Sequence, residues 1–257
     1  MIMFRPFLAL AAMASVVIAA PAPLYAQQAA DTPVLNRSDV ETIVREYLVA
    51  NPEVLEEAFM ALQTKRQATA DAERAEALAS VRDDLESSTN SAVLGNPDGD
   101  VTLVEFFDYN CGFCRRALSD LDELIEGDPN LRVVLKELPV LGEGSVRAAA
   151  VSIAVHNIAP EAYPEFHKKL LSSEGRADDQ VAFAVVDEMG LPRDEIEVAM
   201  RSDKVRDTVS ESNRLARLLQ IEGTPSYVIG DVVEQGAVGV DQLRARINQQ
   251  RCGEDVC

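Results

Sequence analysis

A strongly apolar segment that leads into a pair of cysteines is the feature that most restricts the fold of this chain. Residues 101–107 are apolar, β-branched or aromatic apart from Glu105, and this composition predicts a central, buried strand. Cys111 and Cys114 follow, and apolar residues then recur at helical spacing. The chain is therefore expected to pass from a buried strand into a helix at a CxxC pair.

The position of this pair favours redox chemistry. At a helix N-terminus the Cys111 sulfur meets unpaired amides and the positive end of the helix dipole, which favour thiolate over thiol. Cys114, one turn along, is placed to close a disulfide or to resolve a mixed disulfide with a client protein. A purely stabilising disulfide would close too short a loop to remove much entropy from the unfolded chain. A metal clip would need further ligands, and no second CxxC or nearby histidine supplies them, so we expect neither metal nor cofactor.

The N-terminus has the pattern of a secretory signal peptide. Arg5 precedes the apolar run 7–20, and Ala26 offers a small residue for cleavage. The run is shorter than the roughly 20 residues that cross a bilayer as a helix, although an uncleaved membrane anchor is the alternative. We expect residues 1–26 to be removed and the mature protein to be exported to the periplasm, an oxidising compartment where disulfide chemistry is common.

The charge balance excludes one class of function. The chain has 43 acidic and 24 basic residues and a formal net charge of −19. A nucleic-acid binder needs a basic face to neutralise phosphates, so no nucleic acid is expected as a partner.

Residues 38–88 are expected to form an N-terminal helical segment after a disordered lead-in at 27–37. Ser38 and Glu41 fit a capping box, and a second helix start follows at Asn51 and Pro52. The apolar stripe becomes thin and alanine-rich after Thr64, so the helix cannot form a core alone. It either packs onto the following domain or meets another copy of the chain; we favour self-association into a homo-oligomer.

The remaining residues predict a second domain at 89–251 that mixes strands and helices, an α/β fold. The block 145–219 is helical throughout, and no internal repeat is present. Strands are expected at 92–94, 101–107, 131–136, 223–229 and 232–233, and helices at 148–158, 162–173, 178–189, 194–200, 203–219 and 241–250.

Three motifs and the helical block together resemble the DsbA-like thioredoxin-fold proteins of the bacterial periplasm. The motifs are the run 104–114 with its CxxC, the strand 135–140 and Gly223-Thr224-Pro225. The resemblance covers roughly residues 92–250 and implies a thioredoxin fold with an inserted α-helical domain. It also implies that Thr224–Pro225 is a cis-proline loop that faces the cysteines and presents the Thr224 backbone to an extended client. An ordinary trans turn at this proline is the alternative.

Four charged or titratable positions are further candidates for the site. In the family that this chain resembles, a carboxylate at the place of Glu105 lies beneath the CxxC pair and can relay its proton; a strand-edge glutamate that points to solvent is equally compatible with the sequence. Lys136 could pair with Glu105. His156 and His167 are expected on a helix surface or in the core rather than in catalysis.

The resemblance also bears on the type of activity. The residues between the cysteines are Gly112 and Phe113, whereas the strong oxidase of the family resembles Pro-His there, and Thr224 is the residue found in periplasmic disulfide isomerases. ScsC-type members carry N-terminal helical stalks like the one expected here. These features imply an isomerase or reductase that acts on exported client proteins and is served by a membrane thiol reductase. The alternatives are a dithiol oxidase recycled by a membrane quinone-linked partner and a copper(I)-binding module that uses the same thiolates.

The C-terminal tail 252–257 contains the remaining two cysteines. Cys252 and Cys257 could form a small disulfide, link chains or act as a second redox pair. Because they lie beyond the last expected helix, at the end of the chain, we favour the small terminal disulfide.

Overall fold

The computed structural model describes residues 35–87 and 90–257. The chain divides into two units, residues 1–59 and 60–257. The expected signal peptide (1–26) and residues 27–34 of the expected lead-in (27–37) lie outside the described residues. Within the described part, no helix has the length and apolar character needed to span a bilayer.

Helix α1 (Arg37–Ala50) begins two residues earlier than the expected capping box would place it. Asn36 is the N-cap: its side chain accepts from the Asp39 backbone N–H, and the Asp39 carboxylate accepts from the Asn36 backbone N–H. The prediction of a box between Ser38 and Glu41 was therefore wrong, and so was a lead-in that extends to residue 37. Both pairs fit the capping pattern, and the asparagine cap adds residues to the helix at its start.

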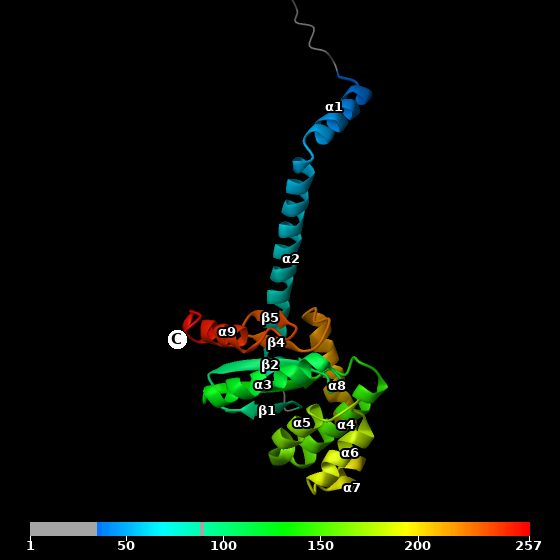
Figure 1. Ribbon diagram of the computed structural model, residues 1–257, viewed down its shortest axis with the longest axis vertical. Helices are drawn as coiled ribbons and strands as arrows, with labels where there is room; N and C mark the ends of the chain where they lie inside the picture. The colour runs from blue at the N-terminus through cyan, green and yellow to red at the C-terminus, as the bar shows by residue number, and fades with distance from the viewer. Residues whose placement is uncertain (1–34, 88–89) are drawn as a thin grey trace, which may run out of the picture. The chain divides into compact units, whose positions relative to one another are not determined.

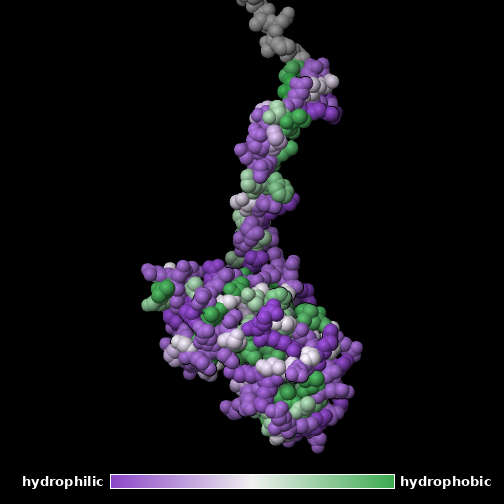
Figure 2. All heavy atoms as spheres, in the orientation of Figure 1, coloured by the Kyte–Doolittle hydropathy of each residue, from purple (hydrophilic) through white to green (hydrophobic). Residues whose placement is uncertain are grey.

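Helix α2 (Glu53–Glu86) starts where Asn51 and Pro52 predicted a second helix. Its buried residues, Leu78, Val81 and Leu85, lie in its last turns. They share a core cluster with residues of the sheet. The alternative that the helix packs onto the following domain is therefore confirmed for these turns. Figure 2 shows apolar side chains at the surface of the N-terminal helices, and in α1 they include Val40, Ile43, Val44 and Tyr47.

A five-stranded mixed sheet forms the centre of the unit 60–257, in the order β1-β3-β2-β4-β5. Strands β2 and β3 are parallel, and every other neighbouring pair is antiparallel. The run 101–107 is the middle strand, which explains why it is apolar on both faces. The strands are β1 (Ala92–Gly95), β2 (Val101–Phe107), β3 (Leu131–Glu137), β4 (Ser226–Ile229) and β5 (Val232–Gln235).

Helices cover both faces of this sheet (Figure 1). One face packs against α3 (Gly112–Gly127) and α9 (Val240–Cys252) through Leu121, Leu124, Leu243 and Ile247. The other packs against the end of α2 and against α8 (Asp203–Leu218). Along β2, successive side chains point to opposite faces of the sheet. Each side chain near the cysteines therefore belongs to only one of the two hydrophobic clusters.

The remaining helices lie in the chain between β3 and β4, as the helical block 145–219 predicted. Helix α4 packs against α5, α6 and α7. The expected helix at 162–173 is confirmed as α5, which is slightly shorter. A short 3₁₀ turn precedes it, and Pro160 and Pro164 each occupy the first turn of a separate element. The elements are α4 (Glu143–Ile158), η1 (Pro160–Ala162), α5 (Tyr163–Leu171), α6 (Asp179–Glu188) and α7 (Arg193–Ala199).

Candidate active site

Cys111 is the N-cap of helix α3. Its backbone is extended, and its Sγ accepts from the backbone N–H of Cys114 at 3.4 Å. The two cysteines are free thiols, and both are buried, with exposed fractions of 5% for Cys111 and 1% for Cys114. The strand-to-helix junction therefore holds the first sulfur at the amide end of the helix, where a negative charge is favoured.

The loop before β4 faces the first cysteine. The peptide bond between Thr224 and Pro225 is cis, the conformation that the resemblance implied. The Cys111 thiol donates to the Thr224 carbonyl oxygen at 3.0 Å. Strand β4 begins only at Ser226, later than expected, because residues 223–225 form this loop and proline has no N–H for the ladder.

Glu105 lies inside the sheet with an exposed fraction of 4%, so the strand-edge alternative is wrong. Burial raises the pKa of its carboxyl to about 8. Burial also raises the pKa of Cys114, and the charge of Glu105 raises it further. Thus Glu105, Cys111, Cys114 and the Thr224–Pro225 loop are brought together at one end of the sheet.

Lys136 does not pair with Glu105. In the register of β2 and β3, Lys136 stands beside Phe106 and Glu105 beside Leu135, so the two charged side chains point to opposite faces. The Lys136 ammonium instead binds Glu211 on α8 at 2.8 Å. Burial lowers the pKa of Lys136, and the interaction with Glu211 partly offsets this.

Glu137, at the end of β3, is a second buried acid that the sequence analysis did not single out. Burial raises its pKa to about 7, and its Oε1 accepts from Ser152 Oγ and Tyr163 OH, both at 3.1 Å. The signal that drew attention to Glu105, an acid in an apolar strand, would have identified Glu137 only if the expected strand 131–136 had been extended by one residue. His167, expected on a surface or in the core, is fully buried, and burial lowers its pKa to about 3.

A pocket of about 290 Å³ adjoins the cis-proline loop. Phe113, between the two cysteines, forms one wall and is 57% exposed, with the Arg116 guanidinium 4.3 Å from its ring centroid. The pocket is lined by Phe113, Gly223, Thr224, Pro225, Ser226, Gln235, Gly236 and Ala237. An apolar side chain would fit here, and sequence reasoning missed this feature because β5 and the residues after it are distant from the cysteines in the chain.

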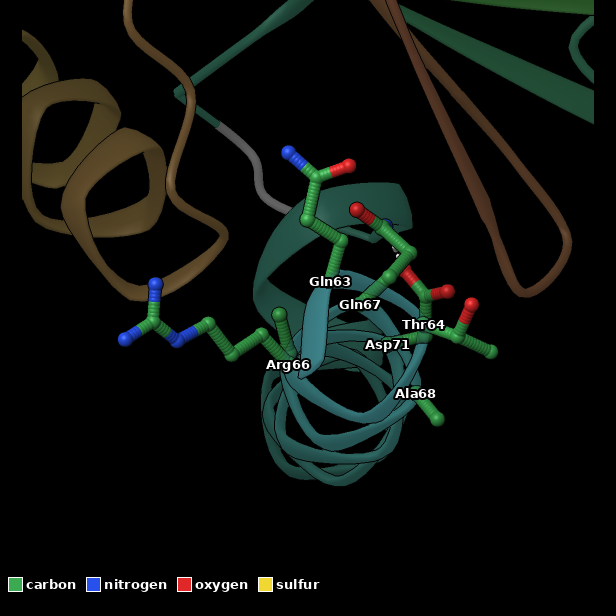
Figure 3. A pocket seen from close by; sticks show the side chains of 7 residues that line it. Gln63, Thr64, Arg66, Gln67, Ala68 and Asp71 are labelled. Atoms are coloured by element: carbon green, nitrogen blue, oxygen red, sulfur yellow. Dashed lines mark hydrogen bonds between the residues drawn. The ribbon is translucent and has the colours of Figure 1, made fainter. Parts of the chain in front are cut away.

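A larger and more open hollow lies on helix α2 (Figure 3). Its lining residues, which include Gln63, Arg66 and Asp71, all come from the stretch 63–71 of this one helix. Such a surface encloses no ligand and contains no cysteine, so it is not the reactive site.

Cys252 and Cys257 form a disulfide, which confirms the small terminal bridge. Arg251, at the end of α9, contacts Asp100 before β2 and Asp128 after α3. These residues flank the start of β2, whereas the CxxC pair follows its end. Within residues 35–87 and 90–257, no group of three or more His, Cys, Asp or Glu side chains is arranged to hold a metal ion.

Comparison with known proteins agrees with this architecture. The family model for the DSBA-like thioredoxin domain matches residues 102–248, and the model for the copper resistance protein ScsC N-terminal domain matches residues 36–69. A thioredoxin-like oxidoreductase from Silicibacter pomeroyi is 39% identical, with 66% of this chain and 97% of that chain covered and a TM-score of 0.64. A linker-deletion mutant of Proteus mirabilis ScsC is 31% identical, covers 86% of this chain and 99% of its own, and has a TM-score of 0.66.

Matches among curated proteins are more distant. Disulfide bond formation protein D of Bacillus subtilis is 24% identical over 63% of this chain and 78% of its own length. The Na(+)/H(+) antiporter NhaA 1 of Salinispora arenicola is 27% identical over 63% of this chain, and the match spans only 25% of that protein. The two family models and the Proteus structure cover the N-terminal helices as well as the sheet. The chain therefore belongs to the DSBA-like thioredoxin family of thiol–disulfide oxidoreductases and carries an N-terminal domain of the ScsC type.

Proposed function

We propose that this protein is a periplasmic thiol–disulfide oxidoreductase that acts on exported client proteins as an isomerase or reductase. Cys111 is the attacking residue. Its thiolate forms a bond to one sulfur of a client disulfide, the client S–S bond breaks, and the other client sulfur leaves as a thiolate.

Two outcomes follow from this mixed disulfide. In isomerisation, a different client thiolate attacks the client sulfur, a new client disulfide forms and Cys111 is released with no net transfer of electrons. In reduction, the Cys114 thiolate attacks Cys111 Sγ, the client leaves as a second thiolate, and two electrons pass from the pair to the client. A membrane thiol reductase would then return the oxidised pair to its dithiol state.

The observation that carries this proposal is the placement of Cys111 Sγ between the Cys114 backbone N–H and the Thr224 carbonyl oxygen. The amide supports a thiolate on one side. On the other side, the Thr224 carbonyl is a backbone acceptor that an extended client chain could use in place of the thiol. Thr224 and Pro225 are thus proposed to hold the client backbone across the attacking sulfur.

Glu105 is proposed to act as the base that accepts the proton of the Cys114 thiol. The thiol is buried and its pKa is raised, so it needs a nearby base before it can attack a mixed disulfide. With a pKa near 8, the Glu105 carboxyl can accept a proton and return it at close to neutral pH. Its burial keeps bulk water from competing for this role.

The organisation around this site is proposed from the sequence. Residues 1–26 direct export and are cleaved near Ala26, residues 38–88 join copies of the chain, and residues 89–251 carry the exchange chemistry. An oligomer raises the local concentration of thiols around one client, which favours reshuffling over single oxidation events. A match to a structure described as a periplasmic thioredoxin-like protein from Salmonella enterica supports the proposed compartment.

The experiment that tests the direction of exchange is the redox state of the CxxC pair in the periplasm, trapped with acid and labelled with a thiol reagent. A largely reduced pair, together with reactivation of scrambled ribonuclease by the purified protein and not by Cys111→Ser, supports the isomerase or reductase. A largely oxidised pair would instead identify a dithiol oxidase recycled by a quinone-linked membrane partner.

Copper(I) binding is a second candidate, favoured by two adjacent free thiols and by the copper resistance description of the family model that matches residues 36–69. Thiolates are preferred ligands of this ion, and an oligomer could combine the pairs of several chains. Metal analysis of the reduced protein after mild copper(I) excess decides the question: binding that Cys111→Ser abolishes supports it, and a copper-free protein ends it.

A further inference from the structure

The residues just before Cys111 are attached to the inserted helices by their side chains. We call residues 108–110 the redox loop. Asp108 Oδ2 accepts from the Leu141 backbone N–H at 2.9 Å. The Asn110 amide donates to Ser145 Oγ and to the Ala177 carbonyl, and accepts from the Ala177 backbone N–H. The loop is therefore held by elements that lie between β3 and β4, far away in the sequence.

Tyr109, in the middle of the redox loop, makes the deepest of these attachments. Its side chain is buried, and its hydroxyl lies 2.7 Å from Ser152 Oγ on α4 and 3.1 Å from His167 Nδ1 on α5. Its ring meets those of Phe107 and His167 edge-on. One hydroxyl thus joins the strand that precedes the CxxC pair to two of the inserted helices.

The number of available protons determines which atoms of this network donate and which accept hydrogen bonds. Ser152 Oγ donates to the Glu137 carboxylate, so its single proton is used. The Tyr109 hydroxyl must then donate to Ser152, and it accepts from the Nδ1–H of neutral His167. The remaining atom, His167 Nε2, is buried and has no hydrogen-bond partner among the described residues. In this tautomer it is an acceptor, so no N–H donor is left unpaired.

The backbone of the same loop holds Cys111. The Asp108 carbonyl accepts from the Cys111 backbone N–H at 2.9 Å. The Tyr109 carbonyl accepts from the Arg115 guanidinium, which also donates to the carbonyls of Ser173 and Gly175 beyond α5. The residue two before the attacking cysteine is therefore fixed at its main chain and at its hydroxyl.

We infer that Tyr109 is a positioning residue for thiol–disulfide exchange: its hydroxyl, bound to Ser152 and His167, fixes the backbone that carries Cys111 at the start of α3. The inserted helices then contribute to the reaction, because their contacts with Tyr109 fix the position of the attacking sulfur. The proposed role of Cys111 as nucleophile underlies this inference. If the hydroxyl only satisfied a buried polar site, its removal would change stability and leave the reactivity of the Cys111 sulfur unchanged.

The test compares two buried hydroxyls. Tyr109→Phe removes the hydroxyl in the redox loop, and Thr208→Val removes a buried hydroxyl on α8 that donates to the Lys204 carbonyl within its own helix. Both are made in a Cys114→Ser background, where Cys111 is the free thiol that iodoacetamide can alkylate at pH 8. Tyr109→Phe is expected to slow alkylation roughly three- to tenfold, the equivalent of one hydrogen bond, and Thr208→Val less than about twofold, with the loss of thermal stability measured for both variants.

A second variant removes the other partner of the hydrogen bond between the Tyr109 hydroxyl and Ser152. Ser152→Ala is expected to slow alkylation in the same direction, and the double variant Tyr109→Phe/Ser152→Ala to be no slower than Tyr109→Phe alone. An unchanged rate in Tyr109→Phe, equal slowing in Thr208→Val, or additive effects in the double variant would overturn the inference. Because alkylation reports on the sulfur and not on client turnover, a failed isomerase assay with these alkylation results intact would reject the proposed function alone.

Discussion

Glu105 and Cys114 lie on the same covered face of the sheet, and the negative charge of the carboxylate adds to burial in raising the pKa of the thiol. The carboxyl is itself buried, with a pKa near 8. Burial therefore keeps both groups mainly protonated at neutral pH, and an ionised Glu105 makes ionisation of Cys114 still less favourable. This relationship yields two predictions, one for stability and one for exchange.

The stability of the protein is expected to fall with rising pH because of Glu105. The folded-state pKa is near 8, above the ordinary value near 4.5 in the unfolded chain. The folded state therefore binds the proton more tightly, and this contribution is fully present below pH 4.5 and lost as the pH rises through 8. Glu105→Gln should be more stable than the parent at pH 8.5, by on the order of a few kcal/mol.

Urea unfolding of both proteins under reducing conditions at pH 4.5 and 8.5 measures this effect. Glu137 also has a raised pKa, near 7, but it is present in both proteins and cancels in their difference. If the difference in unfolding free energy between Glu105→Gln and the parent is the same at the two pH values, the assignment of a raised pKa to Glu105 is contradicted.

The second step of exchange is expected to depend on Glu105. Cys114 must lose its proton to attack a mixed disulfide at Cys111, and the carboxylate is the proposed base. Glu105→Gln should slow release of glutathione from a Cys111–glutathione mixed disulfide by at least ~10-fold, followed by mass spectrometry after acid quenching. Lys136→Met is the control, because Lys136 points to the opposite face; equal slowing in this control would point to general loss of structure.

Helix α1 is expected to mediate self-association through its exposed apolar residues. Val44 lies on the stripe with Val40, Ile43 and Tyr47, and a charge introduced there would be costly to bury between chains. Val44→Glu should convert an oligomer to a monomer and remove isomerase activity while insulin reduction continues. Thr42→Glu places the same charge on the other side of the helix and should leave the molar mass unchanged.

Light scattering on the full-length variants gives the molar mass. A monomeric parent protein would reject self-association and favour the oxidase.

The terminal disulfide is expected to stabilise the end of α9 without taking part in exchange. Cys257 lies only five residues after Cys252, so the closed loop contributes at most about 2 kcal/mol. The double variant Cys252→Ser/Cys257→Ser should lower the melting temperature slightly and reduce insulin at the parental rate. A slower rate, with Cys111→Ser as the inactive reference, would show that the tail exchanges electrons with the CxxC pair.

Several elements followed from local sequence. The strand at 101–107, the helix that begins at the CxxC pair and the second helix start at Pro52 were all predicted from composition and spacing. Capping was less certain: Asn36 with Asp39 and Ser38 with Glu41 satisfy the same pattern, and only the folded backbone distinguishes them. The length of the predicted strand at 223–229 was also wrong, because the local pattern does not show where a loop ends and a ladder begins.

Local pattern by itself determined the chemistry that we propose for this protein: two cysteines lie one helical turn apart, after a buried strand, and this arrangement favours thiol exchange. Tertiary structure alone decided which groups surround them. Lys136 was turned away from Glu105 by strand register, Thr224 was brought to Cys111 from 113 residues away, and Tyr109 was anchored to two inserted helices. The reason is that helix and strand periods reflect neighbours along the chain, whereas these contacts depend on how separate elements pack.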